Sequence, residues 1–159
     1  LQLKQQNIEP DFVFFASCSG GTQAGMVLGK HIHGLQAKLM PVSIAKPEAG
    51  LPSLEETVHE LVNACSNLLQ LNQVPDIDQC RLIEGYDEAG YAVITKNETN
   101  TIKKAAREEG ILLDPVYTAR AFYAMTDFLK NQPAGTPLTV VFWHTGGDAA
   151  NFHYASQLL

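Results

Sequence analysis

A short apolar run that leads into a glycine-rich segment is the feature that most constrains the fold of this chain. Residues 11–17 (DFVFFAS) lack the polar alternation of a half-exposed strand, which is typical of a strand buried on both faces of a parallel sheet. Residues 17–22 (SCSGGT) follow, and residues 22–34 then have the composition of a helix. A strand, a glycine loop and a helix in this order predict an α/β layer fold.

The rest of the chain alternates between predicted strands and helices. Pro41 favours an edge position for a second strand over residues 38–45. Ser53 and Glu56 form an S-x-x-E capping box at the start of an amphipathic helix. Further expected elements are a short strand and loop within 79–95, a helix over 97–109 ended by Gly110, a helix opened by Asp114-Pro115, and a strand over 138–143. We expect one α/β domain over residues 1–159, with three layers and helices on both faces of a mainly parallel sheet.

Charge and composition argue against several classes of function. The 159 residues carry a net charge of −6, whereas a nucleic-acid-binding surface needs a basic face. No apolar run reaches the ~18 residues of a membrane span, and residues 1–10 lack the apolar core of a signal peptide. The three cysteines have no metal-like spacing. We therefore expect a cytoplasmic protein that binds a small molecule, with no metal, nucleic acid or membrane as a partner.

Residues 17–25 (SCSGGTQAG) have the composition of a phosphate-binding cup. Free N–H groups at a helix start can converge on an anion, and the helix dipole adds positive character. The hydroxyls of Ser19 and Thr22 can donate further hydrogen bonds. The glycine spacing matches neither a P-loop nor the dinucleotide-binding fingerprint. The alternative is a tight strand-to-helix turn capped by Thr22.

A second glycine cluster, residues 144–147 (HTGG), follows the last predicted strand. Ligands bind outside the carboxyl ends of strands in parallel sheets. A parallel sheet would therefore bring both glycine segments to one edge, where a single ligand could contact both. The alternative is that Gly146 and Gly147 only end a strand.

Three segments in the same order resemble the D-cysteine desulfhydrase and 1-aminocyclopropane-1-carboxylate deaminase family of pyridoxal 5'-phosphate (PLP) enzymes. They are residues 19–25 (SGGTQAG), 109–118 (EGILLDPVYT) and 144–147 (HTGG). The resemblance runs from about Asp11 to Gly147, and the second segment is its most specific part. It implies a PLP cofactor and the tryptophan-synthase-β-like fold, in which this chain would form part of a fold-type II large domain.

The resemblance also implies site residues. The loop that grips the cofactor phosphate matches Ser19, Gly20, Gly21, Thr22 and Gln23. Thr145 matches the position beside the pyridine nitrogen, and Thr118 is a further candidate contact. Tyr117 and Tyr91 match two active-site tyrosines; the second lies in Gly90-Tyr91-Ala92, where the family usually has Gly-Tyr-Gly. Deaminases tend to have Glu and Leu where this chain has Thr118 and Thr145, which favours the desulfhydrase side.

The activity implied by the resemblance is that of a PLP-dependent lyase. Such an enzyme would perform β-elimination on D-cysteine or a similar small amino acid, giving pyruvate, ammonia and sulfide. A neutral hydroxyl at Thr145 would suit elimination over transamination, and Tyr91 or Tyr117 could transfer a proton if its pKa of about 10 were perturbed. The alternatives are a 1-aminocyclopropane-1-carboxylate deaminase and a non-catalytic domain that binds phosphate or another protein. We also expect a homodimer.

The lysine that binds PLP covalently is the residue that the resemblance does not supply. In the family it stands in an Asn-Lys context in the N-terminal portion, and none of the eight lysines here has that context. The resemblance implies that this chain begins about midway through such an enzyme, without the lysine-bearing segment and the small domain. We therefore expect that it does not turn over substrate alone.

Overall fold

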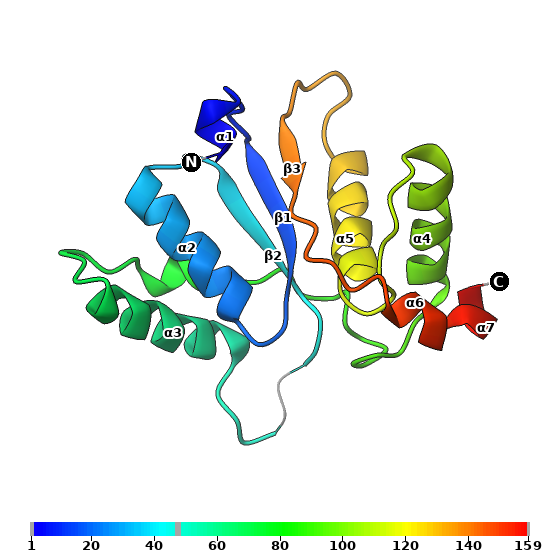
Figure 1. Cartoon of the computed structure of the whole chain (residues 1–159), viewed down its shortest axis with the longest axis horizontal. Coiled ribbons are helices and arrows are strands. Elements are labelled where there is room, and N and C mark those ends of the chain that lie inside the picture. Colours follow the sequence, from blue (N-terminus) through cyan, green and yellow to red (C-terminus); the bar gives the residue numbers. More distant parts are fainter. Residues whose placement is uncertain (1, 47–48, 159) are drawn as a thin grey trace.

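The computed structural model describes residues 2–46 and 49–158 of the chain and confirms the predicted α/β class. Within these residues, three parallel strands form a sheet in the order β2-β1-β3 (Figure 1). The elements are α1 (Gln2–Gln5), β1 (Phe12–Ser17), α2 (Gly21–His33), β2 (Lys38–Ser43), α3 (Leu54–Leu68), the 3-10 helix η1 (Ile77–Cys80), α4 (Lys96–Glu108), α5 (Thr118–Lys130), β3 (Val140–Phe142), α6 (Ala150–His153) and α7 (Ala155–Leu158).

Strand β1 lies in the centre of the sheet. Phe14 is paired with Met40 of β2 on one side and with Phe142 of β3 on the other. Residues 13–17 are all buried, which explains why the sequence of this strand has no polar alternation. Strand β3 is shorter than predicted and begins only at Val140; the N–H of Thr139, just before it, is donated to the carboxylate of Asp11 (2.7 Å).

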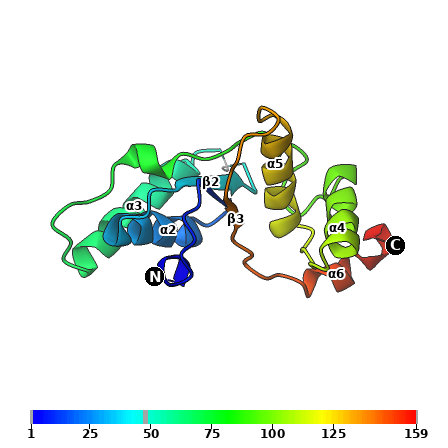
Figure 2. The ribbon, with the colours of Figure 1, turned by 90° about the horizontal axis from the view of Figure 1, so that it is seen from above.

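Each face of the sheet is covered by a pair of helices (Figure 2). Phe14 and Ala16 of β1 point to the face where α5 packs, with α4 outside it. Val13 and Phe15 point to the opposite face, where Met26 of α2 packs against them. Helix α3 lies beside α2, and the two share an apolar cluster that includes Val27. The predicted three-layer arrangement is therefore present in the structure.

Strand β2 occupies an edge of the sheet, as Pro41 predicted. The Pro41 carbonyl accepts a hydrogen bond from the N–H of Ile83 (2.7 Å), and Ser43 donates its N–H to the carbonyl of Ile83 (2.9 Å). The main-chain groups of Pro41 therefore point away from β1. The N–H that proline lacks would have pointed the same way, so no hydrogen bond with β1 is lost. The strand predicted within 79–95 is wrong: η1 and an irregular loop occupy this segment, and Ile83 makes an isolated bridge to Val42.

The helix boundaries follow the predicted caps with one exception. Helix α3 begins with the Ser53–Glu56 capping box, and Gly110 follows α4 with φ of 68°. Helix α5 begins at Thr118 and not at Pro115, because residues 115–117 form a separate turn. The Asp114 carboxylate still caps this turn, since it accepts the N–H groups of Val116, Tyr117 and Thr118 at 2.8, 2.8 and 2.6 Å.

None of the helices in the described part of the chain is both long and apolar enough to cross a membrane.

Candidate cofactor site

A cavity of about 350 Å³ lies at the carboxyl ends of β1 and β3. The loop before α2 and the segment after β3 leave the sheet at the same, lower end in Figure 1. Both glycine segments line the cavity, together with a tyrosine from the turn before α5; among the lining residues are Ser19, Gly20, Thr22, Tyr117, Thr145 and Gly147. The parallel sheet thus brings the two glycine segments to one edge, as predicted.

The first turn of α2 presents unpaired main-chain donors to this cavity. Its N-cap is Gly20, with φ of 83° and no side-chain cap, so Thr22 does not cap the helix. The first helical hydrogen bond runs from the N–H of Ala24 to the Gly20 carbonyl (2.8 Å), which leaves the N–H groups of Gly21, Thr22 and Gln23 without a partner inside the helix, and Thr22 lines the cavity. A side chain at Gly20 would place Cβ 2.9 Å from Cγ2 of Val58, so this close approach also requires glycine.

The side chain of Gln23 lies beneath the cup and not inside the cavity. It is fully buried, accepts a hydrogen bond from the Ser17 hydroxyl at Oε1 (2.7 Å), and donates from Nε2 to the Cys80 carbonyl (2.6 Å). Gln23 therefore fastens the end of β1 to η1, and only its main-chain N–H belongs to the first turn of the cup. Sequence reasoning placed it at the cofactor without separating these two roles.

His144 shapes the second glycine loop. Its Nδ1 lies 3.0 Å from the N–H of Gly146, and its Nε2 lies 2.9 Å from the carbonyl of Leu112. Together these partners assign the neutral tautomer with hydrogen on Nε2. Gly147 packs against Asp114, because an added Cβ would lie 2.9 Å from Cβ and Cγ of that aspartate. The loop is thereby fixed so that Thr145 lines the cavity.

Thr118 lies behind the cavity and is not among the residues that line it. Its side chain is buried, and Oγ1 donates to Oδ1 of Asp114 (2.6 Å) and accepts the Asp114 N–H (2.7 Å). Thr118 therefore holds the turn of residues 114–117 that carries Tyr117 into the cavity. The sequence predicted that Thr118 contacts the cofactor directly. In the structure Thr118 instead supports the turn that carries Tyr117.

Tyr91 and Tyr117 meet at their hydroxyl groups, with the two oxygens 2.5 Å apart. The hydrogen bond to Tyr91, and then burial, raise the pKa of Tyr117 to about 12, with smaller contributions from Cys18 and Asp114. Tyr117 therefore keeps its proton at neutral pH. The structure brings both predicted tyrosines together, although they lie 26 residues apart in the sequence.

A buried arginine behind this pair was not singled out from the sequence. Arg120 is 1% exposed, and its Nε lies 3.2 Å from Oε1 of Glu98. The signal available in the sequence was a lone arginine between Ala119 and Ala121 in an apolar helix.

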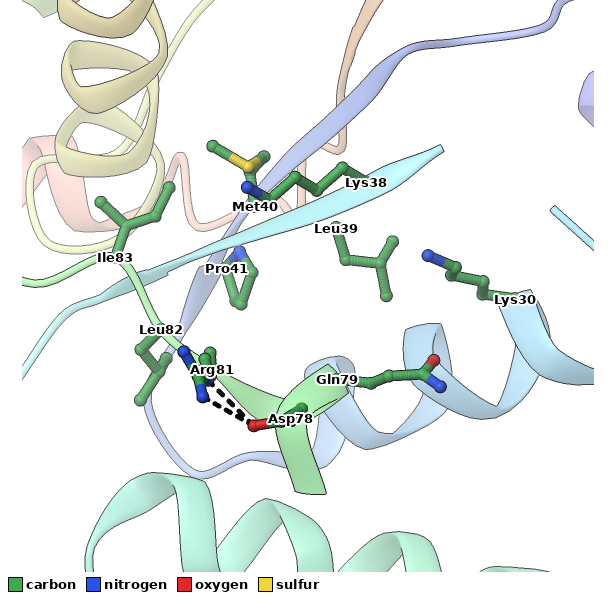
Figure 3. Close-up of a pocket in the computed structure, with 10 residues that line it drawn as sticks. All are labelled: Lys30, Lys38, Leu39, Met40, Pro41, Asp78, Gln79, Arg81, Leu82 and Ile83. Carbon is green, nitrogen blue, oxygen red and sulfur yellow. Dashed lines mark hydrogen bonds and ion pairs between the residues drawn. The ribbon is translucent and has the colours of Figure 1, made fainter. Parts of the chain in front are cut away.

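A second hollow of about 370 Å³ lies along the outer edge of β2, between α2 and η1 (Figure 3). Lys30 extends along this hollow from α2, while Arg81 is bound to Asp78 at 2.7 Å on the exposed surface. Leu39 and Pro41 line the hollow from one face of β2. It contains neither of the glycine segments and lies apart from the tyrosine pair.

Comparison with known proteins decides the family. Residues 1–146 match the family described as pyridoxal-phosphate dependent enzyme. The chain belongs to this family.

Relatives of this PLP-dependent enzyme chain carry two different names. A Pyrococcus abyssi protein named as a provisional 1-aminocyclopropane-1-carboxylate deaminase is 34% identical, with 99% of this chain and 46% of that protein aligned. A D-cysteine desulfhydrase of Klebsiella pneumoniae is also 34% identical, with 99% and 47% aligned. The crystal structure of an ACC deaminase homologue superposes with a TM-score of 0.84 at 29% identity, over 99% of this chain and 46% of that one. The chain thus spans somewhat less than half the length of these relatives.

The residues of the cavity fit the phosphate of PLP. An uncapped helix start and the hydroxyl-bearing residues Ser19 and Thr22 border the cavity, so it can offer hydrogen-bond donors to an anion, and no carboxylate from the described residues lines it. Thr145 lines the cavity from the loop after β3, where its side chain could contact the pyridine ring of PLP. None of the chain's lysines, all of which lie in its described part, lines this cavity. The chain therefore supplies donors for the cofactor but no amine beside it.

Proposed function

We propose that this chain forms the phosphate- and ring-binding half of a PLP-dependent lyase that acts on D-cysteine or a similar small amino acid. The overall reaction consumes one water and converts the amino acid into pyruvate, ammonia and sulfide. The observation that carries the proposal is the pair of bonded tyrosine hydroxyls beside an uncapped helix start. A site that only bound phosphate would have no need of this pair.

The residues of the chain would divide the work as follows. PLP, when bound, supplies an electron sink for the electron pair left at Cα when its proton leaves. The N–H groups of Gly21, Thr22 and Gln23 would hold the phosphate, and the neutral hydroxyl of Thr145 would stand beside the ring nitrogen without a charge. Tyr117 would hold a proton at its hydroxyl oxygen, and Tyr91 would orient that hydroxyl toward the substrate.

The nature of the substrate rests on two threonines. Thr118 and Thr145 stand where deaminases tend to have Glu and Leu, and a relative that is 34% identical is named D-cysteine desulfhydrase. The second candidate is a 1-aminocyclopropane-1-carboxylate deaminase, which the names of other relatives favour. Both candidates use the same phosphate cup.

The substrate proposal is tested on the full-length protein. With D-cysteine we expect equal amounts of sulfide, pyruvate and ammonia, measured separately. With 1-aminocyclopropane-1-carboxylate we expect no ammonia, and L-cysteine serves as the control for stereochemistry. Release of ammonia from the cyclopropane substrate alone would replace this proposal by the deaminase.

The cup is tested by PLP binding to the same protein, measured by equilibrium dialysis. Thr22→Val removes a hydroxyl that would bond to a charged phosphate, and should weaken binding about tenfold. Thr22→Ser keeps the hydroxyl and should bind PLP like the original protein. Equal affinity of the valine and serine variants would show that Thr22 does not contact the phosphate.

A further inference from the structure

A buried ion pair joins α4 to α5 behind the tyrosine pair. The side chains of Arg120 and Glu98 are 1% and 4% exposed, and Nε of Arg120 lies 3.2 Å from Oε1 of Glu98. Two charges removed from water are costly unless their remaining hydrogen-bonding groups are also satisfied. The hydrogen-bond partners of the other guanidinium N–H groups therefore indicate which part of the chain this ion pair holds in place.

Those donors all reach main-chain carbonyl oxygens. Nη1 of Arg120 donates to Ile44 (2.6 Å), just after β2, while Nη2 donates to Val93 (3.0 Å). Both terminal nitrogens also lie 3.3 to 3.4 Å from the carbonyl of Gly90. Gly90 and Val93 flank Tyr91, so the guanidinium clamps the loop on both sides of this tyrosine.

The same carboxylate secures the far end of the loop. Oε2 of Glu98 accepts the N–H of Thr95 (2.7 Å) and the Thr95 hydroxyl, and the first of these bonds belongs to the capping box of α4, in which the Thr95 side chain also accepts the N–H of Glu98. Burial alone would raise the pKa of Glu98, but these hydrogen bonds and Arg120 hold it below its ordinary value, so the carboxylate stays charged. One carbonyl between the clamped positions, that of Ala92, accepts the Tyr154 hydroxyl (2.7 Å).

We infer that Arg120, held by Glu98, is a positioning residue that places the Tyr91 hydroxyl against Tyr117. Tyr91 is 53% exposed, so packing holds its side chain only weakly, and its place depends on the main chain on either side. A displacement of about 1 Å in an active site can cost about 100-fold in rate. The catalytic part of this inference rests on the proposed function; the placement of the hydroxyl does not.

The test replaces Arg120 by lysine, which keeps the buried charge and loses the planar fork that reaches the loop carbonyls. In the complete protein with D-cysteine, Arg120→Lys should lower kcat by about 100-fold and change KM little. Arg107→Lys makes the same change at an exposed position on α4 and should leave both constants unaltered.

The decisive measurement needs no substrate. Carbon-13 NMR of labelled tyrosine rings, assigned with Tyr91→Phe and Tyr117→Phe, follows the titration of Tyr117. Arg120→Lys should lower the pKa of Tyr117 from about 12 toward the ordinary value of about 10 as the Tyr91 hydroxyl moves away. An unchanged titration in the folded variant would overturn the inference, even if D-cysteine proved not to be the substrate.

A second variant guards against loss of folding. Glu98→Gln combined with Arg120→Gln removes both charges together and leaves no unpaired buried ion. The amide oxygen introduced by Glu98→Gln can still accept the Thr95 N–H, but the clamp on Gly90 and Val93 is lost. The same fall in the pKa of Tyr117 is expected, and a folded double variant with the original titration would contradict the role of Arg120.

Discussion

At the scale of single residues, Ala92 holds a backbone conformation that suits glycine. Its φ is 61°, in the left-handed region that costs a residue with a Cβ about 1–2 kcal/mol. It follows Tyr91 in the loop that Arg120 clamps, so this strain is located beside the tyrosine pair.

We expect Ala92→Gly to raise the free energy of unfolding by about 0.5–1 kcal/mol, because relief of the strain exceeds the entropy that glycine adds to the unfolded chain. Urea denaturation measures the change. Ala89→Gly, an exposed position in the same loop without positive φ, is the matched control and should destabilise slightly. A loss of stability in Ala92→Gly equal to that control would refute the strain.

Gly146 and Gly147 separate conformational strain from steric contact. Both have positive φ, of 86° and 98°, but an added Cβ meets no atom within 4 Å at Gly146 and lies 2.9 Å from Asp114 at Gly147. Gly146→Ala should cost about 1–2 kcal/mol of unfolding free energy. Gly147→Ala should cost about 1–3 kcal/mol more, because the aspartate that caps the Tyr117 turn must move. Thermal and urea unfolding measure both, and equal costs would argue against the contact.

At the scale of elements, the start of α3 depends on a local cap. The Ser53 hydroxyl accepts the N–H of Glu56 (3.2 Å), and the Glu56 carboxylate accepts the Ser53 N–H (2.8 Å). Ser53→Ala should lower the free energy of unfolding by about 1 kcal/mol, whereas Ser53→Thr, which keeps a capping hydroxyl, should retain most of it. Urea denaturation distinguishes them, and equal stability of the two variants would show that the cap contributes little.

The two capping boxes differ in what surrounds them. The box of α3 lies on the surface, whereas the box of α4 shares its Glu98 with buried Arg120. The same local sequence signal thus only begins the helix in α3, whereas in α4 it also anchors the loop that carries Tyr91. Only the position of α5 beside α4 makes this difference.

At the scale of the whole molecule, two tyrosines link stability to alkaline pH. Burial, and then a hydrogen bond to Asp127 (2.7 Å), raise the pKa of Tyr86 to about 12, the value also reached by Tyr117. In the unfolded chain both would titrate at about 10. The folded protein therefore binds more protons than the unfolded chain between about pH 10 and 12, and the free energy of unfolding should fall as pH rises through this range.

Tyr86→Phe tests this linkage. The variant should lose stability at neutral pH, since the Asp127 carboxylate loses its partner, and should show a shallower fall above about pH 10. Urea denaturation at a series of pH values measures both. An identical alkaline slope in the variant and the original protein would show that Tyr86 does not contribute.

Local sequence signals were enough to predict the order of the main elements and the place of the first glycine loop between β1 and α2. The uniform apolar character of residues 12–16 specified a central strand, because only a strand covered on both faces needs no polar side chains. The Ser53 cap and Gly110 marked helix ends, since these signals act within a few residues. The glycines at 20 and 21 predicted an anion cup for the same local reason.

The packing of the layers determined the rest of the site, because side chains far apart in the sequence meet only after the elements pack. It placed Gln23 and Thr118 behind the cavity, although they neighbour residues that line it. The strand expected within 79–95 is reduced to a single bridge from Ile83 to β2, and further along the segment the carbonyls of Ala92 and Val93 accept hydrogen bonds from Tyr154 and Arg120. A guanidinium that satisfies carbonyls up to 76 residues away leaves no local pattern in the sequence.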